Sequence, residues 1–507
     1  GGDGFDAAPD PEKPGCGYGQ SQGGNLYYFD LSTGTTLPIV PTESEVKHRF
    51  NWNAGFAVDP FNPATIYLGS QFVHRSRDKG RSWEIISPDL TTNDPERQKQ
   101  SESGGLTLDV SNAENYCTIL SIAPSPLKEG LIWVGTDDGN IQLTKDGGKT
   151  WELVSKTLTT GKKPAVPAGA AVPHIKPSRF DEATAYVVFD DHRRSNFTPY
   201  VFVTRDYGKT WKNLATTELD GYCMAIEEDP VKADLLFVGT EFGLFVSLNG
   251  GQNWFKWTAG FPTCPVYDIA VHPRENDLIV ATHGRSIYVF DDLSPLRELS
   301  AEVMKKKLHL FKINQAFQFV TGRMTSYMSP GDGVYIAQNK PSGVAITYYL
   351  IPTEKKTEEP QPSSPDMSQM QERMAMFAQR GGMDMAAMRQ MMMAAGRVQI
   401  SILDSQGRVV RQLSGPEEKG INRVYWDFRE VEPGPVTDEP DQAQARMQAA
   451  AGFFGGRGGL NVLPGTYTVK IKYEDQEISQ TFEVKPDPRI KVDLGVLKAN
   501  YEKAKEA

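Results

Sequence analysis

The sequence contains no apolar run of about 18 residues or more, the length that a membrane-spanning helix requires. Cysteine is scarce, and Cys16, Cys117, Cys223 and Cys264 show no CxxC spacing. The absence of this spacing argues against a zinc site, and the four cysteines alone do not identify the redox compartment. Basic residues do not outnumber acidic ones: the net charge is -10, with no basic stripe to meet a phosphate backbone. Nucleic acid is therefore not an expected partner.

Turn-forming and strand-forming residues dominate what is present. The 507 residues include 47 glycines and 34 prolines, interspersed with short runs of Val, Ile, Tyr and Phe. This composition predicts an all-β protein of two or three domains. The chain opens at Gly1 without a methionine or an apolar targeting segment, and a strand-like stretch begins at residue 4. We therefore expect a fragment or a processed product.

An internal repeat is the strongest signal in the sequence. Its pattern is Ser/Thr-x-Asp-x-Gly-x-Ser/Thr-Trp, with Asn in place of Asp and of Ser/Thr in the last copy. Asp or Asn can bond back to the backbone of a tight turn, Gly supplies a positive φ, and Trp buries a large ring between neighbouring sheets. The defining residues are Asp78 and Trp83, Asp146 and Trp151, Asp206 and Trp211, and Asn249 and Trp254. We assign the acidic positions to turn structure and give them no catalytic role.

Each copy of the motif lies inside a larger unit of about four short strands, which is the size of one propeller blade. The first and last units lack the motif but keep strand-like runs, such as residues 278–282 and 286–290. The six units span roughly 4–46, 51–90, 115–155, 172–215, 222–258 and 264–297. The sequence predicts a β-propeller over residues 1–297, with about six blades present and the ring incomplete.

The four motifs resemble the Asp-box, or bacterial neuraminidase repeat, of sialidases, some β-glucanases, sortilin-type receptors and photosystem assembly factors. The runs at 133–140, 237–243 and 282–286 resemble large bacterial sortilin-like proteins that carry a "glycosyl hydrolase" label. The resemblance covers about residues 1–297 and implies the propeller fold. It does not imply chemistry, because the Asp-box is a structural turn and a fold does not fix a function.

A charged linker at 298–307 precedes a second domain at 308–488, whose strands alternate apolar and polar residues. The stretches 407–411, 422–427 and 463–467 resemble the immunoglobulin-like domain of the flagellar hook-capping protein. That resemblance implies a β-sandwich acting as a spacer or docking module. Insertions are expected at 354–396 and 435–458, and residues 489–507 read as the start of a truncated helix.

The first insertion is rich in methionine, including Met391, Met392 and Met393. Methionine thioethers can bind Cu(I). No histidine or cysteine accompanies them, and Gln, Ala and Arg are equally frequent, so a mobile or marginally helical surface insertion is favoured over copper. We expect no metal and no cofactor.

Within a blade, the turn between the second and third strands lies on the face opposite the Asp-box turns. We expect ligands on that face, because loops on a rigid scaffold carry function. Two carboxylates there could cleave a glycosidic bond, and an arginine could hold an anion. The catalytic candidates are Asp138, Asp190 and Glu241. The binding candidates are Asp137, Asp138, Asp190, Asp191, His192, Arg193, Glu241, His283 and Arg285. The alternative is ordinary turn chemistry, with the basic residues paired to neighbouring acids.

Our interpretation is a protein that binds protein or polysaccharide through this rim. The family resemblance implies an extracellular, periplasmic or outer-membrane-associated location. Two other functions stay open. One is a glycoside hydrolase, sialidase-like or glucanase-like, although the three arginines and Tyr–Glu pair of a sialidase are not evident. The other is a structural or assembly subunit, which an extensive exposed apolar patch would favour.

Overall fold

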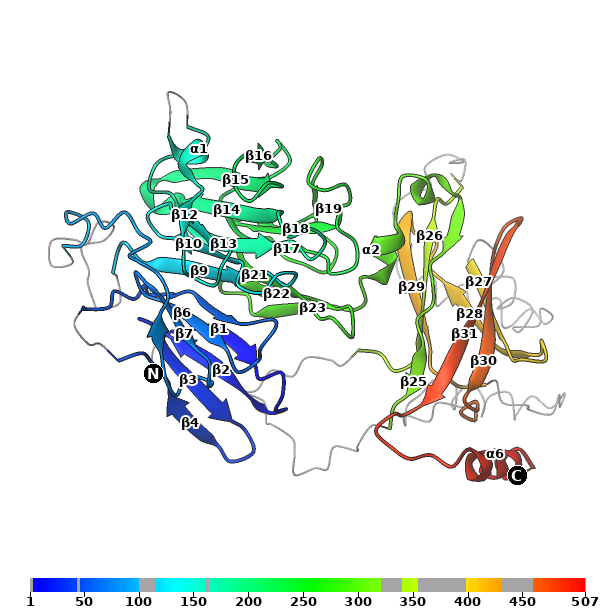
Figure 1. Cartoon of the computed structure of the whole chain (residues 1–507). Helices are drawn as coiled ribbons and strands as arrows, with labels where there is room; N and C mark the ends of the chain where they lie inside the picture. Colours follow the sequence, from blue (N-terminus) through cyan, green and yellow to red (C-terminus); the bar gives the residue numbers. More distant parts are fainter. Residues whose placement is uncertain are drawn as a thin grey trace, which may run out of the picture. The chain divides into compact units, whose positions relative to one another are not determined.

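The computed structural model describes residues 3–42, 46–99, 115–160, 164–320, 340–353, 398–430 and 459–506. The chain divides into two compact units, residues 1–297 and 298–507. Almost all regular structure in both units is β (Figure 1). The predicted methionine-rich insertion at 354–396 and the insertion at 435–458 lie outside the described residues.

The first unit consists of six antiparallel sheets in which consecutive strands are neighbours, and the innermost strand of each sheet contacts that of the next (Figure 1). This arrangement confirms the predicted β-propeller. The blades comprise β1 (Gly4–Pro9), β2 (Cys16–Ser21), β3 (Asn25–Asp30) and β4 (Thr35–Pro38); β5 (Phe56–Val58), β6 (Ile66–Gly69), β7 (Val73–Ser76) and β8 (Glu84–Ile85); β9 (Ile119–Pro124), β10 (Ile132–Thr136), β11 (Ile141–Thr144) and β12 (Glu152–Leu153); β13 (Ala171–Pro177), β14 (Ala185–Asp191), β15 (Asn196–Thr204) and β16 (Lys212–Asn213); β17 (Cys223–Glu228), β18 (Leu236–Thr240), β19 (Gly243–Ser247) and β20 (Phe255–Lys256); and β21 (Val266–Val271), β22 (Leu278–Thr282) and β23 (Ile287–Phe290). Short helical segments follow blade 3 (α1, Lys156–Thr159) and lie inside blade 4 (η2, His192–Arg194).

Blade 6 differs from the expectation of four strands in every unit. It has only β21, β22 and β23, and all of its residues are described. The repeat motif turns the chain back into the fourth strand in blades 2–5, and blade 6 lacks that motif. After β23 the chain runs instead into the short helix α2 (Ser294–Glu298). The edge strand consequently leaves Ile287 and Val289 63% and 56% exposed.

The core of the propeller lies between blades. Second strands such as β10 and β18 are buried at every position, because each is covered by a neighbouring sheet on both faces. Trp133 of β10, for example, shares one apolar cluster with Phe189 and Phe202 of the next blade. Cys16, Cys117, Cys223 and Cys264 are buried free thiols.

The repeat motif forms the same hydrogen-bonded turn in all four copies. In the second copy, Asp146 accepts hydrogen bonds from the Thr150 backbone N–H at 2.9 Å and from the Thr150 hydroxyl at 2.7 Å. These bonds lower the pKa of Asp146 to about 2. In the last copy both partners are asparagine. There Asn249 accepts from the Asn253 backbone N–H at 3.0 Å and donates its own amide to the Asn253 side chain, also at 3.0 Å. The paired replacement therefore preserves both bonds.

The tryptophan of each repeat turn also donates a hydrogen bond to a backbone carbonyl of the preceding blade, and we call this contact the clasp. The Trp151 indole N–H donates to the carbonyl oxygen of Ile86, at the end of blade 2, at 3.0 Å. Gly148 has φ +96°, and a Cβ at this position would lie 2.5 Å from that same carbonyl oxygen. The motif therefore needs glycine for close approach as well as for the turn. The other clasps join Trp83 to Ile39 at 3.0 Å, Trp211 to Val154 at 3.2 Å and Trp254 to Leu214 at 2.9 Å.

The second unit is a β-sandwich with one continuous apolar core. Its two sheets have the strand orders β24-β26-β29 and β25-β31-β30-β27-β28. Ile346, Trp426, Ile400 and Val469 come from both sheets and pack in the same cluster. The bounds are β24 (Leu308–Leu310), β25 (Ala316–Gln318), β26 (Val344–Leu350), β27 (Val398–Leu403), β28 (Val409–Gly415), β29 (Gly420–Trp426), β30 (Gly465–Tyr473) and β31 (Gln476–Pro486), with η3 (Val303–Lys305) before them and α6 (Leu494–Glu506) after them. In the described ranges, no helix has both the length and the apolar character needed to cross a membrane.

Candidate ligand-binding rim

One face of the propeller is formed by the turns between second and third strands together with the segments that enter the innermost strands. Backbone hydrogen bonds join the two sets: Asp137 N–H to the Thr118 carbonyl at 3.0 Å, and Glu241 N–H to the Tyr222 carbonyl at 3.0 Å. We call this face the rim. It contains all of the residues that the sequence nominates for binding or catalysis.

Asp137 is buried at the rim and held by three donors. Its carboxylate accepts from the Thr118 backbone N–H at 2.9 Å, the Thr118 hydroxyl at 2.7 Å and the Asn51 side-chain amide at 3.1 Å. Burial, reinforced by the Asp138 carboxylate, raises the pKa of Asp137 to about 8. The donors come from the segments entering blades 2 and 3, so Asp137 fastens these segments together.

Asp138 is equally occupied. It accepts from the Thr136 hydroxyl at 2.5 Å and from the backbone N–H and hydroxyl of Thr92, both at 2.7 Å. Thr92 belongs to the segment that follows blade 2, so its bonds to Asp138 hold that segment against blade 3. With these bonds made, the carboxylate is poorly placed to act as a free acid or base.

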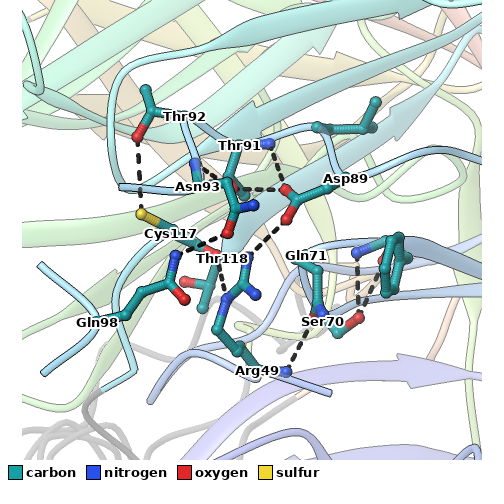
Figure 2. Close-up of polar contacts among 12 residues, drawn as sticks. Arg49, Ser70, Gln71, Asp89, Thr91, Thr92, Asn93, Gln98, Cys117 and Thr118 are labelled. Atoms are coloured by element: carbon teal, nitrogen blue, oxygen red, sulfur yellow. Dashed lines mark hydrogen bonds and ion pairs between the residues drawn. The ribbon is translucent and has the colours of Figure 1, made fainter. Parts of the chain in front are cut away.

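A polar network around the same segment is visible in Figure 2. Arg49 donates to Asp89 at 2.7 Å and to the Cys117 carbonyl at 3.3 Å, and Asp89 also accepts from the Thr91 hydroxyl at 2.6 Å. Asn93 and Cys117 have φ of +51° and +59°, in the left-handed region that non-glycine residues adopt at a cost. The network therefore holds this part of the rim in a defined, locally strained shape.

A cavity of about 470 Å³ opens beside this network. Arg97 crosses its wall: the guanidinium lies 5.2 Å from the centre of the Tyr116 ring and donates to the Tyr116 hydroxyl at 2.8 Å. The volume falls within the range of small-molecule sites. We call it the rim pocket; its lining residues are Thr92, Asn93, Asp94, Pro95, Arg97, Tyr116, Asp138, Ala168 and Gly169.

The turn of blade 4 contains two further acid–base pairs. The Asp190 carboxylate lies 2.7 Å from His192 Nδ1, and Asp191 accepts from Arg194 Nε at 2.5 Å. Both aspartates are buried, whereas Arg193 is exposed. The sequence alone leaves pairing of basic side chains with neighbouring acids as the alternative to ligand binding. Asp190 and Asp191 follow that alternative, whereas Arg193 does not.

Aromatic rings continue along the rim from blade 4 to blade 6. His192 stacks on Tyr222, with centroids 4.3 Å apart and planes at 19°. Further along the rim, Tyr267 stacks on His283, with ring centroids 5.2 Å apart and planes at 26°. Phe197 lies 6.4 Å from Tyr222. We call these five residues the aromatic row. Phe197 and Tyr267 are 50% and 39% exposed, so the row presents apolar ring surface to solvent.

Glu241 and Arg285 border the aromatic row. Glu241 is half-buried, and its negative charge acts on Tyr222. Within the described ranges its carboxylate makes no hydrogen bond or ion pair. Arg285 is exposed, as is its neighbour His283. Of the three catalytic candidates, only Glu241 therefore keeps a carboxylate that local bonds do not already occupy.

Sequence reasoning missed a polar group on the innermost strands. His174 Nδ1 accepts from the Ile226 backbone N–H at 3.1 Å, and Lys176 forms an ion pair with buried Glu227 at 2.6 Å. Burial raises the pKa of Asp6 to about 7, and the charge of Asp268 adds to this effect. The spacing of His174 and Lys176, two apart in one strand, is the signal that places both on one side of it. In the described part of the chain, no three His, Cys, Asp or Glu side chains are placed to hold a metal ion.

Comparison with known proteins identifies distant relatives. No family model matches the chain. An oligoxyloglucan-reducing end-specific xyloglucanase of Emericella nidulans is 24% identical over 211 residues, covering 38% of this chain and 22% of that enzyme. A probable enzyme of the same name from Neosartorya fischeri is 23% identical over 258 residues, covering 46% and 31%. The chain thus spans less than a third of these relatives. A solved GH74 enzyme of Niastella koreensis aligns over 58% of this chain and 53% of its own, at 17% identity and a TM-score of 0.33.

Proposed function

We propose that the propeller binds a polysaccharide at its rim. The observation that supports this most is the aromatic row, which presents partly exposed rings along blades 4–6. The C–H faces of sugar rings pack against aromatic faces, and the apolar surface this buries is favourable. Exposed Arg193 and Arg285 offer hydrogen-bond donors to sugar hydroxyls beside the rings. The distant similarity to xyloglucanases favours a polysaccharide over a protein as the ligand.

Substituting Tyr267→Ala is expected to weaken binding of xyloglucan at least about tenfold, equivalent to about 1.4 kcal/mol. The variant removes an exposed ring and the stacking partner of His283. Isothermal titration calorimetry with xyloglucan measures the change. Phe61→Ala is the matched control, because Phe61 is also exposed but lies in the loop between first and second strands, on the opposite face. Equal effects of both variants, or no binding by the wild type, would contradict the proposal.

Hydrolysis of the bound glycan is the second candidate function, favoured by the two xyloglucanase relatives. Among the nominated acids, Glu241 has the carboxylate best able to act as acid, base or nucleophile. If the protein is a glycoside hydrolase at this rim, Glu241→Gln is expected to lower turnover about a hundredfold or more. Release of reducing sugar from xyloglucan measures this. Asp138→Asn serves as the comparison, because its effect is expected on folding stability through lost bonds to Thr92.

The remaining assignments follow from the family resemblance. An Asp-box propeller of the sortilin-like kind, with an immunoglobulin-like second domain, would work in the extracellular space or the cell envelope. The sandwich would then serve as a spacer or docking module. A purely structural or assembly role is less well supported, because it leaves the rim pocket and the aromatic row unexplained.

A further inference from the structure

Two separate contact zones lie on the rim, and one short element touches both. The 3-10 turn η2 (His192–Arg194) lies between them. At its first residue, His192 stacks on Tyr222 of the aromatic row. At its last residue, Arg194 donates from Nη1 to the Ala168 carbonyl at 2.9 Å, and Ala168 lines the rim pocket. The side chain of Arg194 therefore connects η2 to the wall of the rim pocket, while His192 connects it to the aromatic row.

One wall of the rim pocket is built around Gly169. Nη1 of Arg97 and Nη1 of Arg194 lie 3.5 Å and 3.4 Å from the position that a Cβ on Gly169 would take, and the Tyr116 hydroxyl lies 3.5 Å from it. Both guanidinium groups therefore lie at contact distance from this glycine, whose φ of +77° suits a residue without a side chain. Arginine N–H groups are donors only, so they match acceptor oxygens such as those of sugar hydroxyls and ring ethers.

The chemistry of the two zones differs in a complementary way. The rim pocket is a partly open hollow of mixed polarity that includes guanidinium, hydroxyl and amide groups, and its volume of about 470 Å³ suits one or two sugar rings. The aromatic row is open and extends over three blades, so it exceeds what a single ring covers. Paired acids balance the charges of Arg97 and Arg194, with Asp94 at 3.7 Å and Asp191 at 2.5 Å. A neutral glycan therefore fits better than an acidic one.

We infer that the rim pocket and the aromatic row bind one continuous neutral polysaccharide chain, which passes over η2, so that the protein selects its ligand by length. This inference rests on the proposed function, because it takes the ligand to be a glycan. Linking two contacts through one chain makes the second binding event intramolecular. The affinity therefore rises steeply once the chain reaches both zones, and short oligosaccharides engage only one.

The test uses the full chain and oligosaccharides containing one, two and three repeat units of xyloglucan. Titration calorimetry should show at least a tenfold gain in affinity at the length that spans both zones. Arg97→Gln should abolish that gain, whereas Tyr267→Ala should weaken binding at every length. Arg81→Gln, an exposed arginine in a repeat turn on the opposite face, is the matched control and should change neither.

The outcomes separate the inference from the function on which it rests. Affinity that is independent of length but sensitive to Tyr267→Ala would overturn the two-zone inference and leave glycan binding intact. No binding at any length would overturn both. If Arg97→Gln unfolds the protein, Asn93→Gly tests the same pocket wall, because Asn93 already has a positive φ that glycine adopts freely. This variant should reduce the length-dependent gain; an unchanged gain would contradict the inference.

Discussion

The variant Trp254→Ala is expected to lower the free energy of unfolding of the propeller by about 3–5 kcal/mol. Trp254 is 2% exposed and packs with Leu214 in the core between blades 4 and 5. Alanine would leave a cavity there and would also leave the Leu214 carbonyl without the indole N–H donor, 2.9 Å away. The variant loses both the packing of the indole ring and the clasp hydrogen bond at the same joint between blades. We therefore expect it to destabilise the propeller more than substitution of any other clasp tryptophan.

Tryptophan fluorescence during urea unfolding measures this change, because every tryptophan except Trp426 lies in the first unit. Trp254→Phe should cost less, since it keeps most of the buried ring and loses the hydrogen bond, which contributes about 1 kcal/mol. Phe255→Ala, at an exposed neighbouring position, is the control and should change stability by less than about 0.5 kcal/mol. Similar losses for the alanine variants at 254 and 255 would refute the role assigned to the clasp.

Stability is also expected to fall in mild acid because of a buried histidine. His74 of β7 lies against His48, with ring centroids 4.6 Å apart, and its Nε2 is 2.7 Å from the Ser70 hydroxyl. Burial, aided by His48, lowers the pKa of His74 to about 3. Above pH 6.5 the ring is neutral in both folded and unfolded states. Between pH 6.5 and 3, His74 binds a proton in the unfolded state but not in the folded state. The free energy of unfolding therefore falls by about 1.4 kcal/mol per pH unit.

The comparison of wild type with His74→Gln isolates this contribution. From pH 6.5 to 4 the wild type should lose about 3 kcal/mol more than the variant, measured by urea unfolding at each pH. A difference between variants is needed because Asp6 and Asp137, whose pKa values are raised, act with the opposite sign. Those groups hold protons in the folded state and favour it as the pH falls toward their ordinary values. Parallel pH profiles for wild type and variant would show that His74 does not titrate this way.

The propeller could be predicted because its signal is local. Each repeat turn is closed by side chains a few residues apart, as with Asp146 and Thr150, so a short stretch of sequence contains both partners. The clasp could not be predicted in the same way. Its acceptor is the backbone carbonyl of Ile39, Ile86, Val154 or Leu214, a group that every residue type possesses. The sequence does not distinguish one such carbonyl from another.

The position of the rim residues could be predicted from the sequence, but their hydrogen bonds could not. Counting strands within a blade put Asp138, Asp190 and Glu241 on one face, but it gave no information about their bonding. Asp138 is occupied by Thr92, 46 residues away, and Asp137 by Asn51, 86 residues away. Those partners come from other blades, so only the assembled propeller shows that the aspartates hold loops in place. The same assembly reveals the aromatic row, whose members are scattered from residue 192 to residue 283.

The clasps have a consequence for how the propeller comes apart. Every clasp points backwards, from one blade to its predecessor, and the four of them secure the joints from blade 1 to blade 5. Blade 6, fully described, has no repeat turn, so no clasp secures its joint with blade 5; apolar packing and the ion pair of Arg297 with Asp229 of blade 5, at 2.9 Å, hold it instead. A chain of nearest-neighbour couplings opens at its weakest link. Amide hydrogens of β21–β23 should therefore exchange with solvent ahead of those of β9–β19, and unfolding should begin by fraying from blade 6 inwards.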